Sequence, residues 1–132
     1  MKKRTIKLFS IVTIFALLLS TNILAARDTI YLQSSQKWKS TSAVSRTGQY
    51  TYGYAKCYSV YPSSGKDTFK KIQTHIKSGS TEISDTYTLN EGSSKTSVVI
   101  KEGYLDKKSI VFEFRGNHPD YSAYADVEYF GN

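Results

Sequence analysis

Apolar and polar residues alternate with a period of two along most of the chain beyond residue 26. The clearest segment is 109–115, where Ile110, Phe112 and Phe114 fall on one face of an extended strand. Segment 121–130 alternates in the same way and places five side chains on its core face: Tyr121, Ala123, Ala125, Val127 and Tyr129. Such alternation predicts β-strands with one buried face.

The same pattern, with more interruptions, predicts further strands over residues 28–32, 37–46, 49–61, 68–77, 82–90 and 96–101. Segment 68–77 also fits a helical stripe, but its β-branched residues favour a strand. Turn-forming residues separate these segments, and loop 116–120 is short enough to join the last two strands as a hairpin. We therefore predict an all-β fold, a single-domain antiparallel β-sandwich of roughly six to eight short strands.

Segment 49–61 separates large from small side chains. As a strand, it carries the large ones on one face, namely Tyr50, Tyr52, Tyr54, Lys56, Tyr58 and Val60. The opposite face carries Thr51, Gly53, Ala55, Cys57, Ser59 and Tyr61. Either the rings fill the core, or the small face lies against a second sheet and the rings form a surface platform. The pattern alone leaves both arrangements open.

The first 26 residues have a different pattern. Four basic residues within the first seven positions precede an apolar run over 8–19, and the segment ends in Ala25-Ala26. This order predicts a secretory signal peptide over residues 1–26, cleaved within a residue or two of that point. The apolar run is shorter than the roughly 20 residues that span a bilayer as a helix, and a retained N-terminal anchor is the alternative. We expect a secreted, extracellular protein with its folded domain in residues 27–132 and no transmembrane segment there.

A domain of that length holds one hydrophobic core. Cys57 is the only cysteine, so no disulfide forms within one chain. It falls on the small-residue face of segment 49–61, where we expect it to be buried. A monomer is therefore the expected state, and a dimer linked through Cys57 is the alternative.

The formal net charge of +7 is unevenly distributed. Without the four basic residues of the predicted signal peptide it falls to +3, with +7 in residues 27–79 and −4 in residues 80–132. A basic surface attracts polyanions such as acidic wall polymers, anionic lipid headgroups or nucleic acid. If strands of the two halves mix in the fold, this asymmetry disappears.

Catalytic chemistry has few candidate residues. Histidine occurs only at positions 75 and 118, and no Gly-x-Ser-x-Gly nucleophile elbow is present. Cys57 lies within a strand, away from the electropositive sites that activate a thiol. Glu113, Asp126 and Glu128 fall on neighbouring predicted strands, and we interpret them as a solvated charged face rather than a catalytic carboxylate pair. We expect no catalytic residues and no enzymatic activity.

Loop 116–120 contains an imidazole and a carboxylate, those of His118 and Asp120. Two ligands fall short of the three or four that a zinc site requires. We interpret these residues as turn formers and expect no metal and no cofactor.

The functional hypothesis depends on the aromatic residues. Tyrosine occurs 11 times, and its apolar ring with a polar tip suits half-wet contact surfaces, although β-sandwiches also use it as cross-strand filler. We predict ligand contacts from Trp38, Tyr50, Tyr52, Tyr54, Lys56 and Tyr58. We predict electrostatic attraction from Lys37, Lys39, Lys70 and Lys71.

These residues predict a small secreted, non-enzymatic binding protein that acts at the cell envelope or on another cell. Its expected partner is a cell-wall polymer, an anionic surface or a protein, and export argues against nucleic acid as a physiological partner. One alternative is a secreted antimicrobial or toxin-like protein that acts on membranes. Another is an inhibitor of an exported enzyme, which would present an exposed loop such as residues 62–67.

Overall fold

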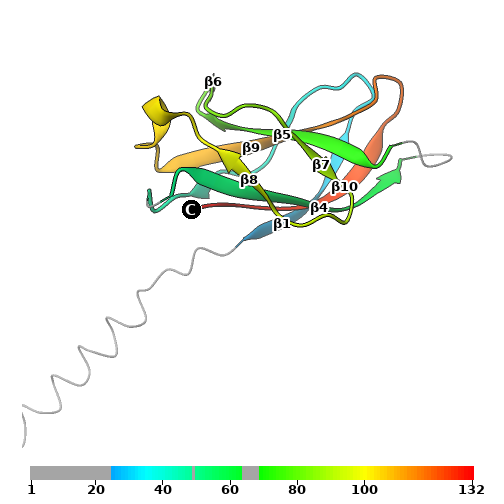
Figure 1. Cartoon of the computed structure of the whole chain (residues 1–132). Helices are drawn as coiled ribbons and strands as arrows, with labels where there is room; N and C mark the ends of the chain where they lie inside the picture. Colours follow the sequence, from blue (N-terminus) through cyan, green and yellow to red (C-terminus); the bar gives the residue numbers. More distant parts are fainter. Residues whose placement is uncertain (1–24, 49, 64–68) are drawn as a thin grey trace, which may run out of the picture.

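Two antiparallel β-sheets pack face to face in the computed structural model, which describes residues 25–48, 50–63 and 69–132 (Figure 1). This arrangement confirms the predicted all-β sandwich. The buried hydrophobic side chains run from Ile30 to Tyr129 in the sequence. Residues 27–132 therefore contain the whole described core.

The four-stranded sheet brings both ends of the described chain together. Its order is β1 (Ala26–Leu32), β10 (Ala123–Gly131), β4 (Tyr52–Pro62) and β8 (Thr96–Val99). Each neighbouring pair is antiparallel, and β10 pairs with β1 on one side and β4 on the other along nearly its whole length. Strands β1 and β8 form the edges of this sheet.

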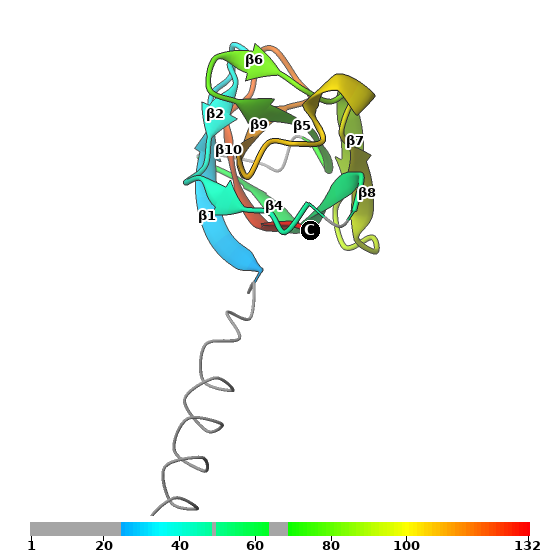
Figure 2. The same cartoon turned by 90° about the vertical axis from the view of Figure 1, so that its left-hand side faces the viewer.

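The six-stranded sheet is built on two long strands. Its main order is β2 (Lys39–Ser40), β9 (Ser109–Gly116), β5 (Lys71–Ser78) and β6 (Thr81–Glu82), with β3 (Val44–Ser45) also on β9 and β7 (Tyr87–Asn90) also on β5. A 3-10 turn, η1 (Glu102–Tyr104), precedes β9. Figure 2 shows β1 and β2 at one edge of the sandwich, where the chain passes from one sheet to the other.

The structure divides the strand predicted over residues 37–46 into β2 and β3. Lys39 pairs with Phe114, and Val44 pairs with Ile110. Five steps along this segment therefore cover four steps along β9, and the extra residue interrupts the ladder. The strand predicted over residues 82–90 is likewise divided, between β6 and β7. The described residues form ten strands, three of which are only two residues long.

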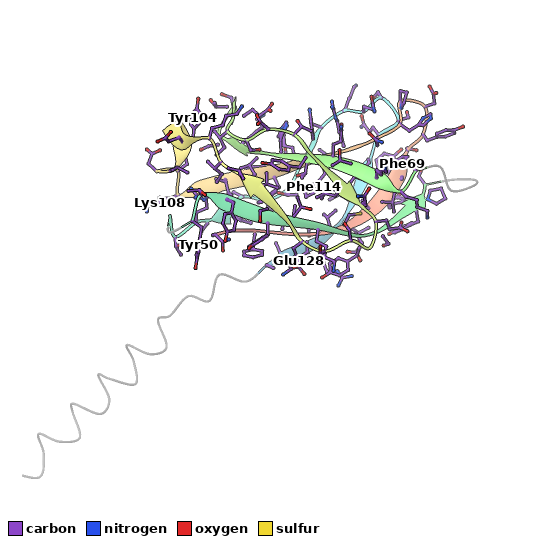
Figure 3. The ribbon with its side chains drawn as sticks, viewed as in Figure 1. Tyr50, Phe69, Tyr104, Lys108, Phe114 and Glu128 are labelled. Atoms are coloured by element: carbon purple, nitrogen blue, oxygen red, sulfur yellow. The ribbon has the colours of Figure 1, made fainter. Side chains whose placement is uncertain are left out.

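The core confirms the alternation of the two clearest strands. Ile110, Phe112 and Phe114 of β9 are fully buried. The buried side chains of β10 are Ala123, Ala125, Val127 and Tyr129. Figure 3 shows Phe114 between the two layers, whereas Tyr50 and Glu128 lie on the outer side of the four-stranded sheet.

The small face of β4 is the buried one. Gly53, Ala55 and Cys57 all point into the core, and a Cβ atom on Gly53 would lie only 2.9 Å from Cζ of Phe112. The ring of Phe112 on β9 and the side chain of Ile76 on β5 fill the space that Gly53 leaves open. The tyrosines of β4 therefore lie on the outer surface, which decides between the two arrangements that the sequence left open.

Cys57 is buried, as predicted. Burial, with smaller effects from the carboxylates of Glu91 and Asp126, raises the pKa of its thiol to about 12. At neutral pH this side chain is therefore a neutral, small hydrophobic group.

The hairpin predicted around loop 116–120 is wrong, because β9 and β10 belong to different sheets. The residues that connect them cross from one sheet to the other. Tyr121, which was predicted in the core, precedes β10 and is exposed. Alternation identifies both strands, whereas their partners depend on hydrogen bonds between residues far apart in the sequence.

Some predictions fall on residues that the structure does not describe. Residues 1–24, which make up most of the predicted signal peptide, lie outside the described ranges, as do 64–67 of the loop predicted at 62–67. In the part of the chain that is described, no helix is long and apolar enough to span a membrane.

Candidate ligand-binding face

The outer surface of the four-stranded sheet carries many aromatic side chains. We call this surface the tyrosine face, and its described rings are Tyr31, Tyr50, Tyr52, Tyr54, Tyr58, Tyr61, Tyr124 and Phe130. They come from β1, β4 and β10 and from the segment just before β4. Because these three strands are neighbours in the sheet, rings that are far apart in the sequence come together here.

A β-bulge places Tyr61 on this face. The β4 residues paired with β10 step from Cys57 to Ser59, so Tyr58 is left out of the register. The extra residue reverses the alternation that follows it, so Val60 is buried and Tyr61 is exposed. The predicted alternation, which grouped Val60 with the rings and Tyr61 with the small side chains, is wrong from this point on.

One part of the tyrosine face is a row of four rings. The ring centroids of Tyr50 and Tyr52 are 5.7 Å apart, and those of Tyr52 and Tyr54 are 5.1 Å apart. Phe130 continues the row at 5.0 Å from Tyr54. Tilted and edge-to-face contacts at such distances are favourable, so each ring restrains the next one.

Arg46 holds the beginning of this row. Its buried guanidinium group donates hydrogen bonds to the backbone carbonyls of Tyr50, Leu105 and Lys107. Burial lowers the pKa of Arg46, but an arginine remains charged in proteins. One buried cation thus ties the segment that carries Tyr50 to the turn before β9.

A second part of the tyrosine face is a cluster of three rings from three strands. Tyr124 of β10 contacts both Tyr31 of β1 and Tyr61 of β4, at centroid distances of 5.3 and 5.7 Å. The exposed fractions of Tyr31, Tyr61 and Tyr124 are 43%, 43% and 39%. These rings and Phe130 were missing from the predicted contact residues. The only sequence signal for Tyr124 and Phe130 was their position opposite the core face of β10.

Tyr58 lies among charged side chains of the same face. The guanidinium of Arg27 is 3.9 Å from its ring centroid, and the ammonium of Lys56 is 4.5 Å away. Its hydroxyl donates a hydrogen bond to Glu128 at 2.9 Å, and this bond is the main reason that the pKa of Tyr58 is raised. Glu128 also pairs with Lys95 at 2.7 Å. These contacts hold Tyr58 in place on the sheet.

Cations and carboxylates pair with each other on this face. Arg27 binds both carboxylate oxygens of Asp126, at 3.1 and 2.6 Å, and this interaction holds the pKa of Asp126 below its ordinary value. The hydrogen bond from Lys95 is the main cause of the lowered pKa of Glu128. The pairing of β1 with β10 thus places a cation of residues 27–79 beside a carboxylate of residues 80–132, whereas Lys95 and Glu128 both belong to the second half.

Trp38 does not lie on the tyrosine face, although the sequence placed it in the same predicted contact set. It precedes β2, in the other sheet, and the centroids of the Trp38 and His75 rings are 3.9 Å apart. The guanidinium of Arg115 is 4.4 Å from the Trp38 ring. Lys37 and Lys39 flank Trp38 in the chain, so the predicted contact residues divide between two places on the molecule.

A buried carboxylate supports the position of Trp38. Glu113 accepts a hydrogen bond from the hydroxyl of Ser40 at 2.6 Å and lies 2.7 Å from Nε2 of His75. Burial acts to raise the pKa of Glu113, but these hydrogen bonds and the nearby Lys77 together lower it. The Glu113 carboxylate lies between the Ser40 hydroxyl and the His75 imidazole. It therefore orients His75 against Trp38, and Ser40 and His75 do not form a serine–imidazole pair.

Glu113 therefore differs from its predicted role on a solvated charged surface, because it is buried. It is also not a neighbour of Asp126 and Glu128, since β9 and β10 lie in different sheets.

Lys70 and Lys71 were also predicted as electrostatic contacts. Lys71 is the first residue of β5 in the six-stranded sheet, and Lys70 directly precedes it. Lys70 is 3.5 Å from Glu91, so its charge is partly compensated within the fold. Of the four predicted lysines, only Lys37 and Lys39 lie next to a predicted contact ring in the chain.

The loop between β9 and β10 contains a turn in which the backbone N–H of Asp120 donates to Nδ1 of His118 at 3.2 Å. No three His, Cys, Asp or Glu side chains among residues 25–48, 50–63 and 69–132 gather as they would around a metal ion. No family model, no curated protein and no solved structure matches this chain. A function must therefore be inferred from the geometry of the tyrosine face and its surroundings.

Proposed function

We propose that this chain is a small secreted binding protein, without catalytic activity, that holds a glycan of the cell envelope or of another cell on its tyrosine face. The observation that carries this proposal is the gathering of eight aromatic rings on the outer surface of one sheet. Monomeric proteins rarely leave large aromatic patches exposed without a partner. A secreted location agrees with the basic, apolar and small-residue order of residues 1–26.

The chemistry of tyrosine favours a sugar chain as the ligand. Each ring offers a flat apolar surface and a hydroxyl group, which match the C–H face and the hydroxyl groups of a sugar. Tyr50, Tyr52 and Tyr54 follow one another along the chain, and Phe130 lies beside Tyr54 on the neighbouring strand. Several adjacent rings suit a polymer with several sugar units better than a single small ligand. Neutral contacts of this kind lose little strength when salt is added.

The restraint of the rings also supports binding. Tyrosine offers a large contact area with few rotatable bonds, so its immobilisation costs little conformational entropy. Here the rings are already restrained by one another and, at Tyr58, by Arg27 and Glu128. A surface that is ordered before binding gains affinity because less freedom is lost in the complex.

Binding of residues 27–132 to purified cell-wall polysaccharide, with salt raised in steps, tests this function. We expect saturable binding that persists at high salt and becomes about tenfold weaker in the double variant Tyr50→Ala/Tyr54→Ala, since each stacked ring contributes roughly 0.5–1.5 kcal/mol. Tyr121→Ala is the matched control, because Tyr121 is 46% exposed and Tyr50 is 49% exposed. Equal binding by both variants, or no binding at low salt, would refute the proposal.

Membrane activity is the second candidate, because Arg27 and Lys56 lie beside the half-buried ring of Tyr58 and Lys95 lies beside that of Phe130. Aromatic rings next to cations suit an interface with anionic lipid. However, Arg27 and Lys95 are paired with carboxylates of the same face, which weakens this attraction. Dye release from anionic vesicles at micromolar protein would favour the membrane-active function over glycan binding.

A further inference from the structure

A pocket of about 310 Å³ opens where the chain passes from the four-stranded sheet to the six-stranded sheet. It is lined by Tyr31 of β1, by Lys39 of β2 and by Gln33, Lys37 and Trp38 between the two strands. This volume lies at the lower end of the range of roughly 300–1,000 Å³ for small-molecule sites. The pocket therefore has room for one small ring rather than for a chain.

The two lysines that line this pocket have no ion-pair partner among the described residues. Neither Lys37 nor Lys39 forms an ion pair with any carboxylate in the described residues, whereas Lys77 and Lys95 both do. Lys37 and Lys39 both line the pocket, and two like charges on one small site favour an anion there. The amide of Gln33 adds a neutral hydrogen-bonding group that can contact a hydroxyl.

The walls of the pocket are aromatic, and one of them is held firmly. Trp38 is packed against His75 and Arg115, and Arg115 itself donates a hydrogen bond to Gln73 at 2.7 Å. The Trp38 side chain is therefore ordered without a ligand. Tyr31 forms the other aromatic wall and also belongs to the tyrosine face, through its contact with Tyr124. The pocket and the tyrosine face thus share a residue.

We propose that this pocket binds an anionic sugar unit, that is, a sugar ring that carries a carboxylate or a phosphate. The aromatic walls fit the ring, Gln33 fits a hydroxyl, and Lys37 and Lys39 fit the anion. The inference rests on the proposed glycan-binding function and deepens it: the glycan on the tyrosine face is acidic, and one of its charged units enters the pocket beside Tyr31.

Trp38 makes the test direct, because it is the single tryptophan of the chain and its fluorescence reports on this pocket. The exported form, residues 27–132, is titrated with methyl glucuronide, glucose 6-phosphate, methyl glucoside and inorganic phosphate at constant ionic strength. We expect a saturable change of fluorescence with one or both anionic sugars and none with the neutral glucoside. Which anionic sugar binds more tightly identifies the carboxylate or the phosphate as the natural group. An equal response to inorganic phosphate, or no response to either anionic sugar, would overturn the proposal.

A charge-matched pair of variants separates the pocket from general electrostatics. Lys37→Gln/Lys39→Gln removes two positive charges from the pocket, and Lys107→Gln/Lys108→Gln removes two from the turn before β9. We expect binding of the anionic sugar to become about tenfold weaker in the first variant and to stay unchanged in the second. Equal weakening in both variants would mean that net charge alone is responsible, which would contradict a specific site.

The outcomes also distinguish this inference from the function on which it rests. If polysaccharide binding requires Tyr50 and Tyr54 but no anionic sugar perturbs Trp38, the tyrosine face binds a neutral glycan and the pocket proposal fails alone. If an anionic sugar binds beside Trp38 while the Tyr50→Ala/Tyr54→Ala variant binds polysaccharide normally, the pocket stands and the role of the tyrosine face fails.

Discussion

Replacing Gly53 by alanine tests the packing of the two sheets that turns the tyrosines of β4 outward. The new Cβ atom would lie 2.9 Å from Cζ of Phe112, 3.0 Å from the backbone oxygen of Phe130 and 3.3 Å from Cδ1 of Ile76. The first two distances are shorter than normal van der Waals contacts. Phe130 belongs to the ladder between β10 and β4, so its carbonyl cannot move away without disturbing the sheet. The ring of Phe112 or the spacing of the two sheets must change instead.

The expected loss of stability follows from two opposing effects. Forcing an extra carbon into a packed core costs about 1–3 kcal/mol. Removing a glycine restricts the unfolded chain and returns about 0.4–1 kcal/mol. We therefore expect Gly53→Ala to lower the free energy of unfolding by about 1–2 kcal/mol, which lowers the melting temperature of a domain of this size by roughly 4–10 °C.

Gly103→Ala is the matched control, since its Cβ atom would meet no other atom within 4 Å and Gly103 has no positive φ. Urea unfolding of the two variants, followed by the fluorescence of Trp38, gives their stabilities. We expect the control to be as stable as the parent protein or slightly more stable. If Gly53→Ala unfolds at the same urea concentration as Gly103→Ala, the small face of β4 does not pack against the rings of β9, and the outward position of the tyrosines loses its basis.

A second substitution identifies the ring responsible. Phe112→Leu removes the atom closest to the new Cβ. If the clash is with this ring, the double variant Gly53→Ala/Phe112→Leu loses less stability than the two single losses added together. Strict additivity would show that the cost arises elsewhere.

Three further outcomes follow from the buried and charged groups. Because the pKa of the Cys57 thiol is about 12, we expect no reaction with a disulfide reagent at pH 8 until urea unfolds the protein, and rapid labelling of the native form would contradict its burial. Arg46→Lys loses the planar group that serves three carbonyls, so its free energy of unfolding should fall by about 2 kcal/mol, and an unchanged urea midpoint would show that this anchor contributes little. Asp126, Glu128 and Glu113 have lowered pKa values in the fold, so the stability they contribute is present at neutral pH and is lost as the pH falls through those folded values. We expect a constant melting temperature from pH 7 to about 5 and a decline below about pH 4, and a melting temperature that stays constant down to about pH 2 would contradict the pairing of these carboxylates.

The sequence by itself determined the class of fold and the position of most strands. Alternation placed Ile110, Phe112 and Phe114 in the core of β9 and separated the small from the large side chains of β4, and the structure confirms both. It also indicated that Cys57 would be buried. These properties are local, because the period of two along a strand reports which side chains share a face.

The tertiary structure alone decided which face of β4 is buried and which strands are neighbours. It placed Tyr124 between Tyr31 and Tyr61, and it moved Trp38 to the other sheet beside two unpaired lysines. The bulge at Tyr58 was equally invisible in the pattern, because a bulge exists only in the register of two paired strands. Sheet order and register depend on hydrogen bonds between distant residues, and the tyrosine face and the pocket are products of that order.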